Sequence, residues 1–131
     1  MPVKVLDAYE YESYSNIAAG ITWATDHGVR VVNLSLAGTT DGSTLSSAVL
    51  YAHDHGVVVV AAAGNYGKNT PVYPAAYPQV LSVAGSDSSD ALYSWSNHGS
   101  WVKLAAPGQN ETTDVGSFYG NFSRLLPPLP S

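Results

Sequence analysis

Four histidines are the side chains best suited to acid–base chemistry in this chain, which has no cysteine. They are His27, His53, His55 and His98. A serine nucleophile would need one of them as its base and a carboxylate to orient the imidazole. No serine stands in the G-x-S-x-G turn that exposes such a nucleophile. A Ser-His-Asp site could therefore arise only by convergence in space, which a sequence pattern does not reveal.

A metal site is not predicted. His53 and His55 flank Asp54, and this spacing points neighbouring helical side chains to different faces. The H-E-x-x-H spacing of helical zinc sites is absent. The stretch from Gly64 to Lys68 also lacks the G-x-x-x-x-G-K-[ST] spacing of a phosphate-binding loop. We therefore expect neither a metal nor another cofactor.

Two further candidate segments are made of small and polar residues that follow apolar runs. One is Asn33-Leu34-Ser35-Leu36-Ala37-Gly38, and the other is Ala61-Ala62-Ala63-Gly64-Asn65. Small residues at such points let a ligand or another backbone approach closely. Taken alone, each segment fits a tight strand-to-loop turn equally well.

The surrounding apolar pattern predicts the strands and helices that would hold these segments. Strands are expected over residues 2–6, 29–34, 57–63, 79–85 and 101–106. A helix capped by Ser15 is expected to run to about Gly28, and one capped by Ser43 or Thr44 to about His55. In both, apolar residues recur at helical spacing and a glycine follows. The fold class is therefore α/β, a parallel sheet of about five strands with flanking helices in a Rossmann-like three-layer sandwich.

The apolar content of the second predicted strand is nearly continuous, and residues 57–63 form the clearest buried run. Such strands are typical of a parallel sheet that is covered on both faces. In sheets of this kind, ligands bind beyond the carboxyl ends of the strands. Both small-residue segments lie at such ends.

Composition excludes several classes of function. The net charge is −5, and no cluster of lysine and arginine offers a surface for nucleic acid. No apolar run is long enough to span a bilayer. The first eight residues lack the basic and apolar regions of a secretory signal, and the compartment is not indicated. The balance of 45% hydrophobic and 11% charged residues favours one folded domain.

The order of the segments resembles the subtilisin-like serine proteases, the subtilase family or peptidase family S8. The matching stretches are VKVL, GITWA, VVNLSLAG, GVVVVAAAGN, YPAAYPQVLSVAG and LAAPG. The resemblance runs from about Val3 to Gly108 without a large gap. It implies a truncated subtilisin-like α/β domain, serine endopeptidase ancestry, and peptide or protein substrates. Members of the family are usually secreted.

The resemblance also implies roles for the two small-residue segments. Asn65, which ends AAGN, would donate its side-chain N–H to the oxyanion of the tetrahedral intermediate, where a fixed donor meets developing charge. Ser35, Leu36, Ala37 and Gly38 match the S-L-G-G segment that binds substrate backbone as an added strand and forms one wall of the S1 pocket. Ala37 replaces a glycine there, and its methyl is expected to narrow the pocket or shift the backbone. The opposite wall would be Ala62, Ala63 and Gly64.

Two features of the following turn come from the same resemblance. Tyr73-Pro74 matches a tyrosine-proline bond that is cis in relatives, so we expect a cis bond here. The carbonyls of Ala75, Tyr77 and Val80 match a weak cation site of some relatives. Because no acidic partner is evident, an empty turn is the expectation for this chain.

The catalytic triad is expected to lie outside this sequence. In the family, the aspartate and histidine motifs precede VKVL, and the G-T-S-x-A-x-P serine motif follows APG. Here VKVL begins at residue 3, and residues 109–131 contain no G-T-S motif. The prediction is an internal fragment of the catalytic domain that lacks the Asp/His/Ser triad, with a truncated α/β domain over residues 1–108 and a divergent tail over 109–131.

Truncation would also alter the sheet. In the family another strand lies between the VKVL and VVNLSL strands, so we expect either collapse of Val3–Leu6 onto Val31–Leu34 or strand exchange between two chains. An exposed edge or apolar patch would favour a homo-oligomer. The alternatives are a non-catalytic peptide-binding or self-associating module, a split enzyme completed by a second chain, and an unrelated α/β ligand-binding protein.

Overall fold

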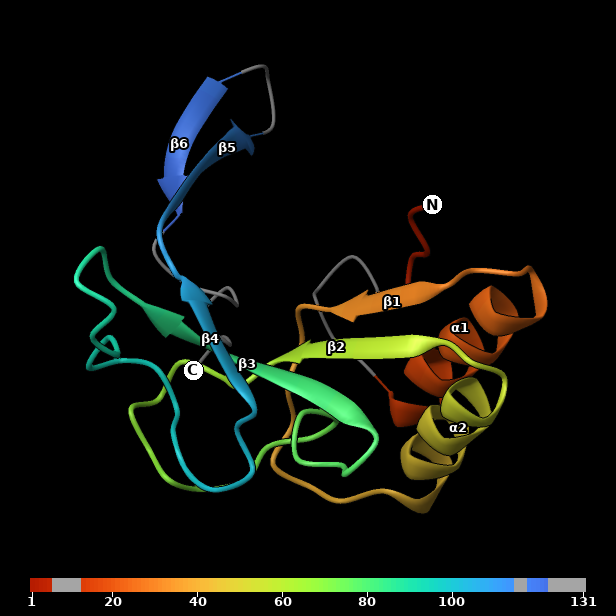
Figure 1. The fold of residues 1–131 in the computed structure, drawn as a ribbon. Helices are drawn as coiled ribbons and strands as arrows, with labels where there is room; N and C mark the ends of the chain where they lie inside the picture. The colour runs from red at the N-terminus through yellow and green to blue at the C-terminus, as the bar shows by residue number, and fades with distance from the viewer. Residues whose placement is uncertain (6–12, 115–117, 123–131) are drawn as a thin grey trace.

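A four-stranded parallel sheet forms the centre of the fold in a computed structural model that describes residues 1–5, 13–114 and 118–122. Its strands lie in the order β1-β2-β3-β4 (Figure 1). They are β1 (Val31–Leu34), β2 (Val58–Ala62), β3 (Val80–Ser86) and β4 (Leu104–Pro107). The predicted α/β fold and parallel sheet are confirmed, with four strands in place of about five.

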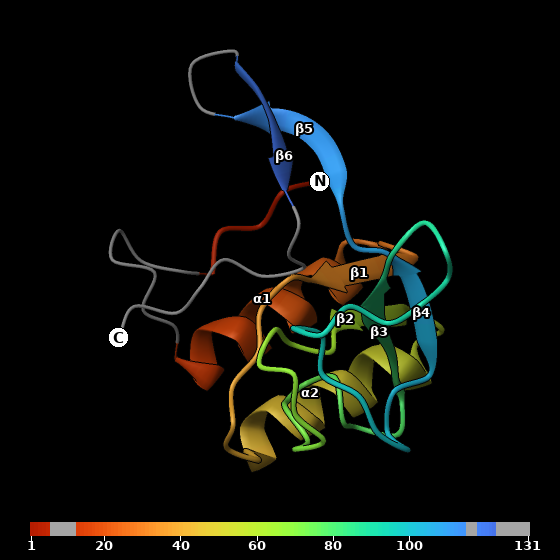
Figure 2. The same cartoon turned by 90° about the vertical axis from the view of Figure 1, so that its left-hand side faces the viewer.

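Two helices lie side by side and cover one face of the sheet (Figures 1 and 2). Helix α1 is Tyr14–Asp26 and helix α2 is Ser43–Asp54. The cap of α1 is Ser13 and not Ser15, because the Ser13 hydroxyl accepts a hydrogen bond from Asn16 N at 3.2 Å. The cap of α2 is Gly42, so the predicted cap at Ser43 or Thr44 is wrong: Ser43 is already the first residue of the helix. Neither described helix has the length and apolar content needed to cross a membrane.

The hydrophobic core lies between the helices and the covered face of the sheet. Its largest fully buried members include Ile17 and Ile21 from α1, Leu45 and Val49 from α2, and Val59 from β2. These residues recur at helical spacing in the helices and at alternate positions in β2, so each element buries one side. The two helices therefore fix the positions of β1 and β2.

The other face of the sheet is exposed where β1 and β2 begin and at the start of β4, so the expected cover on both faces is incomplete in the described part of the chain. This exposed part is called the open face of the sheet. Val31 is 58% exposed, Val58 is 49% exposed, and Leu104 of β4 is 51% exposed. Val31 and Val58 are also partners in the β1–β2 register, so they lie side by side on this face. The apolar content of the strands indicated two covered faces, but both described helices pack on the opposite side.

The N-terminal segment does not form the predicted strand over its described residues. Residues 1–5 have no strand assignment and do not pair with β1, and Leu6 lies outside the described residues. A cavity of about 120 Å³ lies between the segment and β1, lined by Val3 and Val31 among others. The collapse of Val3–Leu6 onto Val31–Leu34 as paired strands is therefore wrong for the described part, and strand exchange stays a prediction.

Contact with α1 explains this departure. The Val5 side chain lies across the helix at Gly20, where a Cβ would come 2.5 Å from Val5 Cγ1. The Val5 side chain thus packs against α1, and the backbone of the segment does not pair with the sheet.

A hairpin follows the sheet. Strand β5 (Asn110–Asp114) pairs antiparallel with β6 (Phe118–Phe122), and Figures 1 and 2 show the pair extending away from β4. Sequence reasoning treated this region only as a tail. The overlooked signal is the Gly-Ser pair at residues 116–117 between runs that contain threonine and aromatic residues.

Candidate functional site

The two small-residue segments leave the sheet from neighbouring strand ends. Leu34 pairs with Ala61 in the β1–β2 register, so the chain leaves β1 at Ser35 beside the end of β2 at Ala62. Each segment thus follows the carboxyl end of a parallel strand, and the structure adds that the two strands are adjacent. Side chains in this position are suited to contact a ligand beyond the carboxyl edge of the sheet.

The segment after β1 runs from an exposed residue into the protein interior. Ser35 is exposed, and Leu36 and Gly38 are partly buried. Ala37 is 6% exposed and belongs to the hydrophobic core. The structure therefore places the Ala37 methyl among the residues of the core.

Gly38 is held by the turn that precedes β3. Gly38 N donates to Tyr73 O at 2.9 Å, and Tyr73 N donates to Gly38 O at 2.8 Å. The next peptide bond, Tyr73-Pro74, is cis, which confirms the prediction. The reciprocal pair of bonds fixes the backbone of the Ser35–Gly38 segment at its far end.

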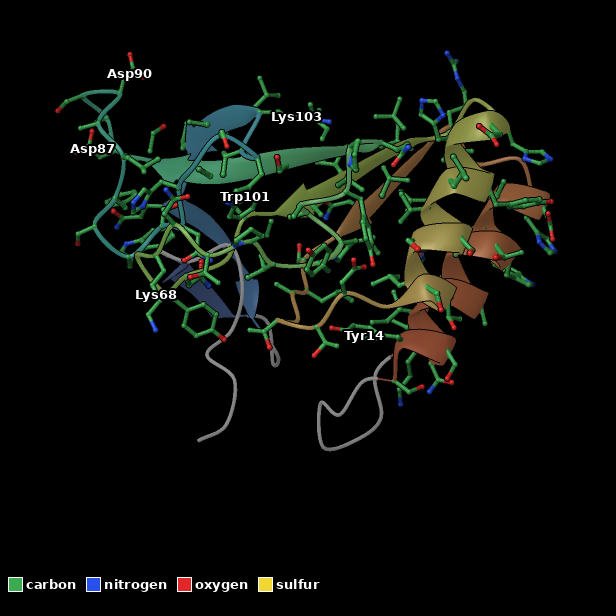
Figure 3. The ribbon with its side chains drawn as sticks, turned by 90° about the horizontal axis from the view of Figure 1, so that it is seen from below. Tyr14, Lys68, Asp87, Asp90, Trp101 and Lys103 are labelled. Atoms are coloured by element: carbon green, nitrogen blue, oxygen red, sulfur yellow. The ribbon has the colours of Figure 1, made fainter. Side chains whose placement is uncertain are left out.

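Tyr14, the first residue of α1, covers Gly38 and was missed by sequence reasoning. A Cβ on Gly38 would collide with Tyr14 Oη, and one on Gly42 would lie 3.1 Å from Tyr14 Cδ2. Figure 3 shows Tyr14 at the start of its helix, next to the segment that leaves β1. No spacing pattern marks this tyrosine, because the contact joins a helix start to a loop further along the chain.

The opposite segment stays close to the sheet before it turns. Ala62, Ala63 and Gly64 are buried, and Ala63 N donates to Val83 O of β3 at 2.8 Å. Gly64 then adopts a φ of +96°, which a residue with a side chain rarely adopts. Asn65 follows this turn and is partly buried. The predicted wall and the predicted oxyanion donor are therefore consecutive at the end of β2.

A second loop, centred on Asn97, contacts the loop that carries Asn65. Asn97 is 1% exposed, and its Oδ1 accepts from Tyr66 N at 3.0 Å and from Lys68 N at 3.1 Å. Figure 3 shows Lys68 at the end of the sheet remote from the helices. Sequence reasoning did not select Asn97, because a lone asparagine in a polar loop has no distinguishing pattern.

The turn between the cis bond and β3 is fixed by Tyr77. The Tyr77 hydroxyl donates to Asp41 Oδ1 at 2.9 Å and accepts from Gly42 N at 3.3 Å, at the start of α2. Burial, with a further contribution from Asp41, raises the pKa of Tyr77 to about 12. The hydroxyl is therefore neutral, and ties the turn to α2, across the ordinary pH range.

The carbonyls considered for a cation lie in this turn. Tyr77 O accepts from Val80 N at 3.0 Å. The Lys103 ammonium donates to the carbonyl of Pro78, and Figure 3 shows Lys103 beside the sheet. A positive charge at Pro78, the residue after Tyr77, disfavours a cation at the Tyr77 carbonyl. The residues described also contain no group of three acidic or histidine side chains that could hold a metal.

The histidines are dispersed over the surface. His27 and His55 place Nδ1 against the carbonyls of Trp23 and Tyr51, at 2.7 and 2.8 Å. His53 faces Asp54, and His98 is exposed. In residues 1–5, 13–114 and 118–122, no serine hydroxyl bonds to a histidine. The structure therefore assembles no Ser-His-Asp site in this part of the chain.

Comparison with known proteins gives one consistent family. The profile described as the Subtilase family matches residues 1–126. Thermitase of Thermoactinomyces vulgaris is 47% identical over 108 residues, covering 82% of this chain and 39% of thermitase. Subtilisin Savinase of Lederbergia lenta is 40% identical over 122 residues, covering 92% of this chain and 45% of Savinase.

A solved structure agrees with the sequence relatives. The crystal structure of a cold adapted subtilisin-like serine proteinase matches with a TM-score of 0.85 and 32% identity, covering 93% of this chain and 46% of that one. The chain thus spans less than half the length of each of these three relatives.

Proposed function

Because this chain belongs to the subtilase family, we propose that it is a catalytically incomplete part of a subtilisin-like serine endopeptidase domain. It holds the oxyanion donor and the segments that bind substrate backbone, and it lacks the Asp/His/Ser triad. The sheet and helices of residues 1–108 provide these segments, and the β5–β6 hairpin follows them. The observation that carries the proposal is the exit of both binding segments, with Asn65, from neighbouring strands.

The proposed mode of binding is the addition of an extended peptide beside Ser35–Gly38. Main-chain hydrogen bonds would hold the peptide, and side-chain pockets would select it. The exposure of Ser35 and the fixed backbone at Gly38 support this mode, because a pre-formed edge loses little freedom on binding. Tyr14 would contact the peptide from the other side of Gly38.

Asn65 would face the carbonyl of the bound peptide. A side-chain amide can donate to a carbonyl oxygen, and it donates more strongly as that oxygen gains negative charge. Without a nucleophile and base this stabilisation produces no turnover. The proposal therefore combines peptide binding with an absence of hydrolysis by the isolated chain.

A peptide titration tests this function. The ligand is an N-blocked tetrapeptide amide, and the amide resonances of Leu36 and Gly38 are expected to shift on binding. The amides of Val31 and Val58, whose side chains lie on the open face of the sheet, serve as the internal control and should not shift. Shifts confined to the open face would contradict groove binding.

The absence of hydrolysis is tested with a chromogenic peptide p-nitroanilide. No release above the buffer rate is expected. Turnover that disappears when a single serine of this chain is replaced by alanine would overturn the proposal, since it would reveal a nucleophile.

Self-association is a second candidate function, and the open face of the sheet favours it. Val31, Val58 and Leu104 expose apolar surface there, and exposed apolar patches mark interaction sites. Sedimentation velocity should show an oligomer that Val58→Lys dissociates. The matched control is Leu50→Lys on α2, where the parent residue is 46% exposed. A monomer at all concentrations would exclude this candidate.

A further inference from the structure

The loop that carries Asn65 is held by a loop from much further along the chain. Residues 93–100 lie against residues 64–68, and backbone hydrogen bonds join them. These bonds link Gly67 N to Trp95 O at 2.8 Å, Asn97 N to Gly64 O at 2.9 Å, and His98 N to Lys68 O at 3.1 Å. Any residue other than proline at position 97 could make the backbone part of this contact.

The side chain of Asn97 adds contacts that depend on its identity. Its Oδ1 accepts from both Tyr66 N and Lys68 N, at 3.0 and 3.1 Å. The side chain is buried, so water is not available to replace it as the acceptor. Two amides of the loop therefore share one buried acceptor, and removing it would leave both donors unsatisfied.

The nitrogen of the Asn97 side-chain amide lies against Gly64, where the loop begins. A Cβ on Gly64 would lie 2.6 Å from Asn97 Nδ2, so this nitrogen occupies the space that glycine leaves. One side chain thus contacts the loop at Gly64, before Asn65, and at Tyr66 and Lys68, after it.

We propose that Asn97 is a positioning residue, whose side chain fixes the Gly64–Lys68 loop and thereby aims the amide of Asn65. The inference rests on the proposed function, since it assigns a partner to the oxyanion donor named there. Asn97 touches no substrate. Its effect is pre-organisation, because a donor stabilises developing charge only when it is held in place before the reaction.

Ser96 provides a matched control for the role of Asn97. It is the neighbouring residue and is also 1% exposed. Its hydroxyl accepts from Gly85 N of β3 at 2.9 Å and donates to the backbone oxygen of Asn97 at 3.2 Å. Among the hydrogen bonds of the described residues, the hydroxyl makes none to the Asn65 loop or to the Asn97 side chain. Removing either side chain costs a buried hydrogen bond, but only Asn97 acts on the loop.

The first experiment measures amide hydrogen exchange in the full chain without peptide. In Asn97→Ala, exchange at Tyr66 and Lys68 should accelerate by about tenfold, as expected when a buried acceptor is lost. In Ser96→Ala, these two rates should stay within about twofold of the unmodified chain, since neither lost hydrogen bond involves the Asn97 side chain or an amide of the Asn65 loop. Asn97→Asp keeps an acceptor oxygen, so it should restore the protection near pH 7. Unchanged rates in Asn97→Ala, or equal acceleration in both alanine variants, would overturn the proposal.

The unmodified chain provides a second measurement that needs no variant. A scalar coupling across the hydrogen bond is expected between Tyr66 ¹⁵N and Asn97 ¹³Cγ. Failure to observe this coupling, when couplings across the sheet are observed, would also overturn the role of Asn97.

A peptide-binding measurement then tests whether the contacts of Asn97 with the loop affect the proposed function. Asn97→Ala should weaken binding of the N-blocked tetrapeptide amide by several-fold more than Ser96→Ala does. If the unmodified chain binds no peptide, the proposed function fails, and the exchange rates still decide whether Asn97 fixes the loop. If peptide binds and Asn97→Ala leaves both affinity and exchange unchanged, the inference fails alone.

Discussion

The amide nitrogen of Asn97 fills the space beside Gly64 in which a side chain would have to sit, 2.6 Å from the position of a Cβ. Two distant parts of the sequence therefore constrain each other at one point. The loop after β2 needs a glycine, and the space made by that glycine is used by a buried polar side chain.

Gly64→Ala should destabilise the chain by about 2–4 kcal/mol, since it combines a positive φ with a collision against Asn97. The control is Gly28→Ala, at a φ of +75° with nothing within 4 Å of the new methyl. It should cost only about 1 kcal/mol, the conformational part. Urea unfolding of both variants measures the difference, and equal losses would rule out the contact with Asn97 as a cause.

Tyr77 should make the chain sensitive to alkaline pH. Its pKa is raised to about 12 in the folded state, against an ordinary value of about 10 when unfolded. The neutral phenol is therefore favoured by folding, so this stabilisation is complete below pH 10 and is lost as pH rises from 10 to 12. Tyr77→Phe should lower the stability at pH 9 but flatten the decline above pH 10. Parallel stability curves for the two proteins would contradict this assignment.

Ser13→Ala should destabilise α1 by about 1 kcal/mol, because the first-turn amide of Asn16 loses its acceptor. Ser15→Ala is the informative comparison, since Ser15 was the cap predicted from sequence and lies inside the helix. It should change the free energy of unfolding by less than about 0.5 kcal/mol. Thermal unfolding followed by circular dichroism distinguishes the two, and a larger effect at Ser15 would reverse the assignment of the cap.

Two leucines of α2 test which face of the helix is buried. Leu45 is fully buried and Leu50 is 46% exposed. Leu45→Ala should cost about 2–5 kcal/mol, because it leaves a cavity in the core. Leu50→Ala should cost about 0.5 kcal/mol or less. Similar losses at both positions would show that partner chains or other segments bury the outer face of α2 in solution.

The α/β fold, both helices and the four strands of the parallel sheet could be predicted from the sequence, because these elements have local patterns. Apolar spacing marks α1 and α2, and β-branched runs mark β1 to β3. The predicted first strand at residues 2–6 has the same kind of pattern, but its described residues 2–5 pair with none of the four strands of the sheet. Tertiary contact with Gly20 then decides where Val5 lies. Pattern alone could not show this, since pairing is a property of two segments.

The candidate site was predictable only in part, for the same reason. Asn65 and the Ser35–Gly38 segment follow strands, so their place at the sheet edge could be anticipated. Tyr14, Tyr77 and Asn97 act on those segments through contacts between residues far apart in sequence. Neither composition nor spacing identifies such a residue. The cis bond at Tyr73-Pro74 was anticipated through family resemblance and not from local pattern.

The pair of hydrogen bonds between Gly38 and Tyr73 also has a consequence for the order in which parts of the chain fold during synthesis. The segment 35–38 is synthesised early, but the residue that fixes its backbone emerges much later from the ribosome. The same is true of the loop at residues 64–68, which waits for Asn97. A nascent chain can therefore form β1, α2 and β2 while its binding edge is still unshaped. Peptide recognition by the proposed edge would therefore be acquired only after Asn97 has been synthesised.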